Sequence, residues 1–150
     1  MMRKTFLLTA LLLSTGFLFS ARAQIRKIPA EVTNAFSEKY PDAKNVEWSD
    51  NLSTFTASFE QDGYKYKAQY NKKGEWKGAE KELTIEDLSS TVKDGFNKSK
   101  YADWKVKSVT QVESPGDKIQ YRVHVIKSDL KQKNLTFNEK GKLVKDSSTL

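Results

Sequence analysis

The strongest constraint in this sequence of 150 residues is an internal repetition. A helical stripe of apolar residues recurs 60 positions further along the chain, and two strand-like segments recur at offsets of 66 and 67. The paired segments are 28–40 with 88–100, 55–59 with 121–125, and 68–76 with 135–143. A match in this order at a nearly constant offset is not expected by chance. The sequence therefore predicts two copies of one unit, at about residues 28–82 and 88–146.

Each unit changes from a helical to a strand-like periodicity. The first stripe places its apolar residues at helical spacing, on Ile28, Val32, Ala35, Phe36 and Tyr40. The segments after it alternate apolar and polar residues, and Asp62-Gly63 and 71–74 supply turns between them. The predicted fold class is α+β, a tandem repeat of one helix packed on a four-stranded antiparallel sheet. The expected inward positions are Val46, Trp48, Phe55, Ala57, Phe59, Tyr66, Ala68, Tyr70, Val123, Val125, Leu135 and Phe137.

The two units are expected to fold together as one domain, residues 24–150. A unit of about 60 residues is marginal alone, because small domains bury only about 60% of their unfolded surface. The segment between the units, 80–87, contains no glycine or proline. We therefore interpret 80–87 as a short connection rather than a flexible linker.

The first 23 residues have the features of a secretory signal peptide. A basic head precedes an apolar run of about 15 residues and then Ala21-Arg22-Ala23. A membrane anchor is the alternative, but the run is shorter than the roughly 20 residues that span a bilayer. Cleavage between Ala23 and Gln24 would release a periplasmic or secreted protein, with no membrane association afterwards. No cysteine follows the run, so a lipoprotein N-terminus is excluded.

Composition excludes several classes of function. The chain has no cysteine and one histidine, so disulfide scaffolds, zinc knuckles and cysteine nucleophiles are excluded, and any catalytic triad would need His124. No catalytic residue, metal or cofactor is predicted, and a hydrolase is disfavoured for lack of a nucleophile–base set. Loss of residues 1–23 leaves 23 basic and 19 acidic residues, interleaved along the chain. Nucleic acid is therefore not an expected partner, because such binders gather their cations into a patch.

The landmarks of the chain resemble the PepSY-like family of exported bacterial proteins, which is related in fold to β-lactamase inhibitor protein. The resemblance covers about residues 28–146. It is carried by Ile28-Pro29-Ala30-x-Val32-x-x-Ala35-Phe36-x-x-Lys39-Tyr40-Pro41-x-Ala43, Val46-x-Trp48, Tyr70-Asn71-Lys72-Lys73-Gly74-Glu75-Trp76 and, in the second copy, Leu88, Val92, Tyr101 and Phe137-Asn138-Glu139-Lys140-Gly141-Lys142-Leu143. Leu88-Ser89 departs from the Leu-Pro expected at the second helix. The resemblance implies a location in the Gram-negative envelope and no established catalytic residues, and it carries no inhibitory residue over to this chain.

The remaining candidate site is the polar face of the predicted sheets. If the helices cover one face, alternation directs Thr56 and Ser58 to the other, together with six residues that we take as a candidate protein-binding face. These six are Lys65, Lys67, Gln69, Arg122, His124 and Thr136. A solvated outer face is the alternative, because polar outer sheet faces are common. Arg122 is of a residue type enriched among binding hot spots, and the face is expected to be mildly basic.

These observations predict an exported, non-enzymatic binding or inhibitor-like module. Its expected partner is an envelope protein such as a protease, a hydrolase or a sensor, contacted through the exposed sheet face. The alternative is an envelope stress or structural protein that binds a small ligand between the two repeats. The sequence pattern indicates no oligomeric state.

Overall fold

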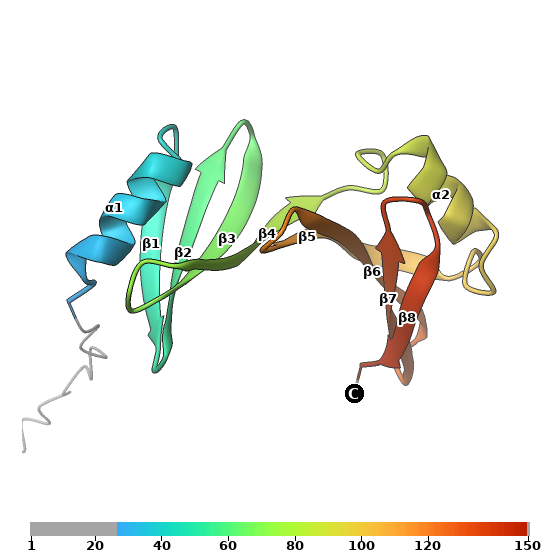
Figure 1. Ribbon diagram of the computed structural model, residues 1–150. Coiled ribbons are helices and arrows are strands. Elements are labelled where there is room, and N and C mark those ends of the chain that lie inside the picture. Colours follow the sequence, from blue (N-terminus) through green and yellow to red (C-terminus); the bar gives the residue numbers. More distant parts are fainter. Residues whose placement is uncertain (1–26, 150) are drawn as a thin grey trace, which may run out of the picture.

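A computed structural model describes residues 27–149 (Figure 1). The predicted signal peptide and the Ala23/Gln24 cleavage site lie outside these residues. The elements follow the order α1, β1–β4, α2, β5–β8. They are α1 (Ala30–Lys39), β1 (Lys44–Asn51), β2 (Thr54–Gln61), β3 (Tyr64–Asn71), β4 (Trp76–Leu83), α2 (Ser90–Asn97), β5 (Lys105–Ser114), β6 (Lys118–Ser128), β7 (Lys131–Asn138) and β8 (Leu143–Ser148).

The two helices begin differently. Pro29 precedes α1 with φ −59°, and its carbonyl accepts hydrogen bonds from the N–H groups of Val32 and Thr33, as suits a proline at a helix start. Ser89 caps α2, because its hydroxyl accepts a hydrogen bond from the Val92 N–H at 3.3 Å. The second copy therefore has a serine, Ser89, where the first copy has Pro29, and both residue types are suited to the start of a helix.

All eight strands form one antiparallel sheet in chain order. β4 pairs with β5 in register from Ala79↔Glu113 to Leu83↔Val109, so the sheet continues without a break between the N-terminal half (α1, β1–β4) and the C-terminal half (α2, β5–β8). The fold is thus α+β with two helices and an eight-stranded sheet.

The interpretation of 80–87 as a connection was wrong for its first part. β4 extends to Leu83, so residues 80–83 are strand and only the remainder is loop. The sequence hides this strand because charges alternate along it, yet it has a neighbour on each side. Lys81 is accommodated because its ammonium lies 3.7 Å from the centroid of the Tyr64 ring.

Both helices pack on the same face of this sheet. Ala79 and Val109, from the neighbouring strands β4 and β5, belong to the two cores, and the register places both residues on the helix side. In Figure 1, α1 and α2 lie at opposite ends of the molecule, with β4 and β5 between them. The N-terminal core is Val32, Phe36, Phe55, Ala57, Phe59, Ala68, Tyr70 and Ala79. The C-terminal core is Leu88, Val92, Phe96, Tyr101, Val109, Val123, Val125, Leu135 and Phe137.

Val46, predicted as an inward residue of the first strand, is not part of the core. Val46 is 38% exposed, and the β1–β2 register shifts between Lys44 and Glu47. Asn45 in this bulge has φ +54°. An extra residue in a strand reverses the alternation on one side of it. The match of 28–40 with 88–100 aligns Lys100 with Tyr40, but the residue that enters the C-terminal core is the next one, Tyr101.

A matching turn fixes each helix to its sheet. In the β3–β4 turn the Asn71 Oδ1 atom accepts hydrogen bonds from the N–H groups of Lys73 and Glu75, and Asn138 makes the equivalent bonds in the β7–β8 turn. Gly74 and Gly141 adopt φ +80° and +72°. A Cβ on Gly74 would collide with the carbonyl oxygen of Glu31, so only glycine allows this close approach.

Candidate protein-binding face

The sheet face opposite the helices, here called the helix-free face, contains all six predicted binding residues. Lys67 lies across from Ser58, Lys65 from Glu60, and Gln69 from Thr56. Arg122 lies across from Thr136, and His124 across from Asn134. Continuous pairing through β4 and β5 places the two sets on one surface.

The named residues differ in how far they reach solvent. Thr56 is 7% exposed, and its hydroxyl accepts a hydrogen bond from the Asn51 side-chain amide at 3.0 Å. Lys65, Lys67 and Gln69 are exposed. Thr56 is therefore the one predicted face residue with little surface to offer a partner.

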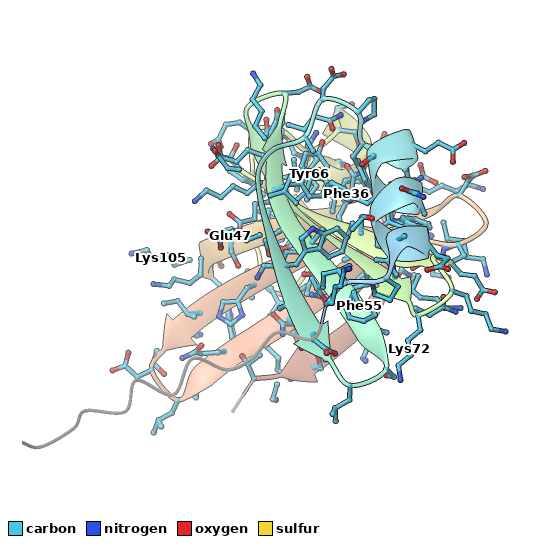
Figure 2. All side chains as sticks on the ribbon, turned by 90° about the vertical axis from the view of Figure 1, so that its left-hand side faces the viewer. Phe36, Glu47, Phe55, Tyr66, Lys72 and Lys105 are labelled. Atoms are coloured by element: carbon cyan, nitrogen blue, oxygen red, sulfur yellow. The ribbon has the colours of Figure 1, made fainter. Side chains whose placement is uncertain are left out.

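A first hollow of about 710 Å³ lies on this face, across strands of both halves. Its lining includes Glu47 from β1, Lys67 from β3, Glu80 from β4 and Thr110 from β5. Figure 2 shows Glu47 on the side of the strands away from α1, whereas Phe36 and Phe55 lie between α1 and the strands. The hollow therefore belongs to the helix-free face rather than to the core.

A second hollow of about 570 Å³ lies on the C-terminal half of the same face. Its lining is Val112, Gln120, Arg122, Asn134, Thr136, Val144, Lys145 and Ser147. Val144 is 47% exposed, so this hollow combines apolar surface with hydrogen-bonding side chains.

The expectation of a mildly basic face overlooked four glutamates that line the first hollow. They are Glu47, Glu60, Glu80 and Glu82. Glu80 and Glu82 fall in the segment interpreted as a connection, but β4 presents both to the helix-free face. Period-two alternation would have found them if the strand had been extended to Leu83.

Arg122 joins the two halves of the face. Its Nη1 atom lies 3.1 Å from Glu80 Oε1, and the two side chains remain 40% and 44% exposed. An exposed pair of this kind contributes about 0–1 kcal/mol to stability. Its main effect is to orient the guanidinium, which has donors left for another acceptor.

His124 contacts two amide side chains of β7. Its Nδ1 atom lies 2.9 Å from Asn134 Oδ1, and its Nε2 atom lies 3.2 Å from Gln132 Oε1. The ring is therefore part of a hydrogen-bonded row along the sheet, with no carboxylate or nucleophile among these contacts.

A charged cluster on the helix side was missed by the sequence reasoning. Asp146 accepts a hydrogen bond of 2.5 Å from the Tyr101 hydroxyl, with Lys100 at 3.6 Å and Lys133 at 3.8 Å. This bond is the largest cause that lowers the pKa of Asp146 and raises the pKa of Tyr101. The partners are 45 positions apart, so no local pattern indicates them.

Asp87, in the loop between the halves, has structural contacts. Asp87 accepts hydrogen bonds from the Thr84 N–H at 2.7 Å and from the Tyr64 hydroxyl at 3.0 Å. The hydrogen bonds from Thr84 are the largest cause that lowers the pKa of Asp87. This carboxylate closes the loop after β4.

Residues 27–149 contain neither a membrane-spanning helix nor a metal-binding cluster of side chains. Neither helix there is both long and apolar enough to cross a bilayer. That part of the chain also contains no group of three or more His, Cys, Asp or Glu side chains arranged to hold a metal ion.

Solved structures share this fold. A DUF2874 family protein of Bacteroides ovatus has 28% identity and a TM-score of 0.76, with 79% of this chain and 86% of that chain covered. A BLIP-like protein of Bacteroides fragilis has 26% identity and a TM-score of 0.76, with 79% and 84% covered. A Bacteroides eggerthii structure described as "putative periplasmic proteins" has 23% identity and a TM-score of 0.73, with 79% and 87% covered, and shows likeness of fold alone.

Comparison with the curated proteins finds no match. Residues 53–145, more than half of the chain, match the model of the family described as "Putative beta-lactamase-inhibitor-like, PepSY-like". The matched segment runs from β2 to β8 and includes the pairing between the two halves. The resemblance seen in the sequence motifs is thereby confirmed, and the chain belongs to the PepSY-like family, with a BLIP-like fold.

Proposed function

We propose that this chain is an exported, non-enzymatic binding or inhibitor-like module that contacts a protein partner through its helix-free face. One observation carries the proposal: the helices leave one face of an eight-stranded sheet uncovered, and that face has two hollows lined by charged and amide side chains. Family membership supports the inhibitor-like class. The partner we propose is an envelope protease, hydrolase or sensor.

Export to the periplasm or beyond is part of this proposal. It rests on the signal-peptide pattern of residues 1–23, which predicts cleavage between Ala23 and Gln24. N-terminal sequencing of the protein from the producing cell would yield Gln24 as the first residue. An intact Met1 would contradict export by cleavage.

We also infer that the two halves are tandem copies of one unit. The support lies in equivalent contacts: Val32 and Phe36 in α1 match Val92 and Phe96 in α2, and the Asn71 and Asn138 turns share their hydrogen bonds. Each copy contributes four strands to the common sheet.

The test is a crosslinking pull-down from the native envelope with residues 24–150, which contain both helices and all eight strands. It is run beside a variant carrying Lys65→Glu, Lys67→Glu and Arg122→Glu. The matched control carries Lys72→Glu, Lys73→Glu and Lys140→Glu, the same charge change in exposed turns. Loss of one specific protein in the first variant and its retention in the control supports the proposal, whereas identical captures contradict it.

A small ligand between the two halves is the second candidate. The observation that favours it is the 710 Å³ hollow, because side chains of both halves line it. Its charges are mixed, with lysines among the glutamates, which suits a ligand that bears both charges. Saturable thermal stabilisation by a small molecule, abolished by Glu80→Gln with Lys67→Gln, would support this candidate over a protein partner.

A further inference from the structure

The charges on the helix-free face are distributed unequally between its two halves. In the N-terminal half, glutamates alternate with Lys65 and Lys67. In the described strands β5–β8, the register directs both carboxylates, Glu113 and Asp146, to the helix side. The helix-free side of those strands thus has cations and neutral groups but no carboxylate. Its cations include Lys118, Arg122 and Lys145, with Lys105 and Lys107 at the start of β5.

Arg122 and Lys145 flank Thr136 in one row across β6, β7 and β8. The two cations are two strands apart, about 10 Å at the usual strand spacing. Arg122 has one acidic partner in the described residues, Glu80, which belongs to the other half. The described ion pairs give Lys145 no acidic partner.

The surface between these cations is partly apolar. Val112 and Val144 line the 570 Å³ hollow, with the amide side chains of Gln120 and Asn134 beside them. A small inorganic anion would pair with the cations but leave the valines exposed. A peptide segment would use all three kinds of group, because it brings carboxylates, apolar side chains and backbone amides together.

We propose that the C-terminal half of the helix-free face receives an acidic segment of the partner protein, with carboxylates on Arg122 and Lys145 and an apolar side chain against Val112 and Val144. This inference rests on the proposed function and adds the chemistry and the position of the partner. Glu80 occupies the guanidinium of Arg122 in the free protein, so it competes with the partner's carboxylate. Lys65 and Lys67 are not part of this binding site for the acidic segment, because glutamates of the same chain surround them.

The test uses an acetylated and amidated peptide of alternating glutamate and valine, added to ¹⁵N-labelled residues 24–150 and followed by NMR. The expected shifts fall on amides of β6–β8. The variant Arg122→Gln with Lys145→Gln, which removes charge but keeps polar side chains, is expected to bind about tenfold more weakly or worse, since charge-assisted hydrogen bonds are lost. The matched variant Lys72→Gln with Lys73→Gln, in the exposed β3–β4 turn, is expected to bind like the wild type, and Glu80→Gln more tightly.

Four results would overturn the inference: no shifts with the peptide, shifts mainly on β1–β4, equal shifts with the glutamine-for-glutamate peptide, or the same shifts with inorganic phosphate or phosphatidylglycerol vesicles alone. The envelope pull-down separates this failure from failure of the proposed function. Suppose that capture is lost only in the variant Lys65→Gln with Lys67→Gln. The helix-free face would then still bind a protein, but the binding of an acidic segment to β5–β8 would be overturned.

Discussion

The two halves of the molecule build the same frame from different core residues. The N-terminal core combines aromatic side chains with three alanines, and Phe36 alone contacts four other rings. The C-terminal core uses branched aliphatic residues such as Val123, Val125 and Leu135, and Phe96 contacts one ring, that of Phe137. The same helix-on-sheet arrangement is therefore compatible with two distributions of side-chain volume.

The halves also differ in buried polar atoms. Tyr70 is 1% exposed, and its hydroxyl has no hydrogen-bond partner among the described protein groups. The equivalent residue of the C-terminal half is Phe137, which has no such group. Burial raises the pKa of Tyr70, and it raises the pKa of Tyr40 to about 12. The N-terminal core thus includes a desolvation cost that the C-terminal core avoids.

The largest expected difference between the halves comes from truncating the central helix phenylalanines. Phe36→Ala should lower the free energy of unfolding by about 5 kcal/mol and Phe96→Ala by about 3 kcal/mol, since Phe36 also loses its ring contacts. Urea unfolding of both variants measures the difference. An equal or larger loss for Phe96→Ala would show that aromatic contacts do not distinguish the cores.

A substitution of Gly95 tests how closely each helix approaches its turn. A Cβ on Gly95 would collide with the carbonyl oxygen of Gly141, whereas the equivalent residue of α1 is Ala35, which already has a Cβ. Gly95→Ala should therefore destabilise by about 2 kcal/mol, although alanine is the better helix former by about 1 kcal/mol. The matched variant Ala35→Gly should lose about 1 kcal/mol. A gain in thermal stability for Gly95→Ala would contradict the tighter approach of α2.

Removing the buried hydroxyl from the N-terminal half should raise the stability of the protein, and adding one at the equivalent position of the C-terminal half should lower it. Tyr70→Phe removes an unpaired buried polar group and should raise the free energy of unfolding by about 1 kcal/mol, whereas Phe137→Tyr should lower it by about the same amount. Thermal unfolding of the two variants and of the double variant measures this exchange. A loss of stability on Tyr70→Phe would mean that the hydroxyl makes a contact in solution.

The smallest expected effect is the part of the pH dependence that the Tyr101–Asp146 hydrogen bond contributes in the C-terminal half. The pKa of Asp146 is lowered in the folded protein, so its stabilisation is present above its unfolded pKa, near 4, and is lost as the pH falls below that. The pKa of Tyr101 is raised, so stability also declines as the pH rises above about 10. Tyr101→Phe should reduce the slope of both limbs of the stability–pH profile, with Tyr66→Phe as the control. An unchanged profile would show that the Tyr101–Asp146 bond contributes nothing.

Alternation within single strands made much of this structure predictable. The two faces of β2, β3 and β6 follow from it, and so do the positions of Lys65, Lys67, Gln69, Arg122 and His124 on the helix-free face. Period-two patterning reports the local direction of each side chain, which tertiary contacts rarely reverse.

Two features depend on information that no local pattern contains. The bulge at Asn45 shifts the register at the start of β1, where Val46 is exposed rather than buried. Residues 80–83 are strand because β5, about 30 positions further along the chain, pairs with all four of them, while β3 pairs with Glu80 and Lys81. Missing that strand also hid Glu80 and Glu82 from the candidate site.

The unbroken pairing of β4 with β5 determines how large a partner this face can meet. With strands about 4.8 Å apart and eight residues spanning about 26 Å, four strands offer a footprint of roughly 400 Å² and eight strands roughly 900 Å². A standard protein–protein interface buries about 800 Å² on each partner. Either half alone falls well below that area, and the five residue pairs between Ala79↔Glu113 and Leu83↔Val109 bring the molecule above it.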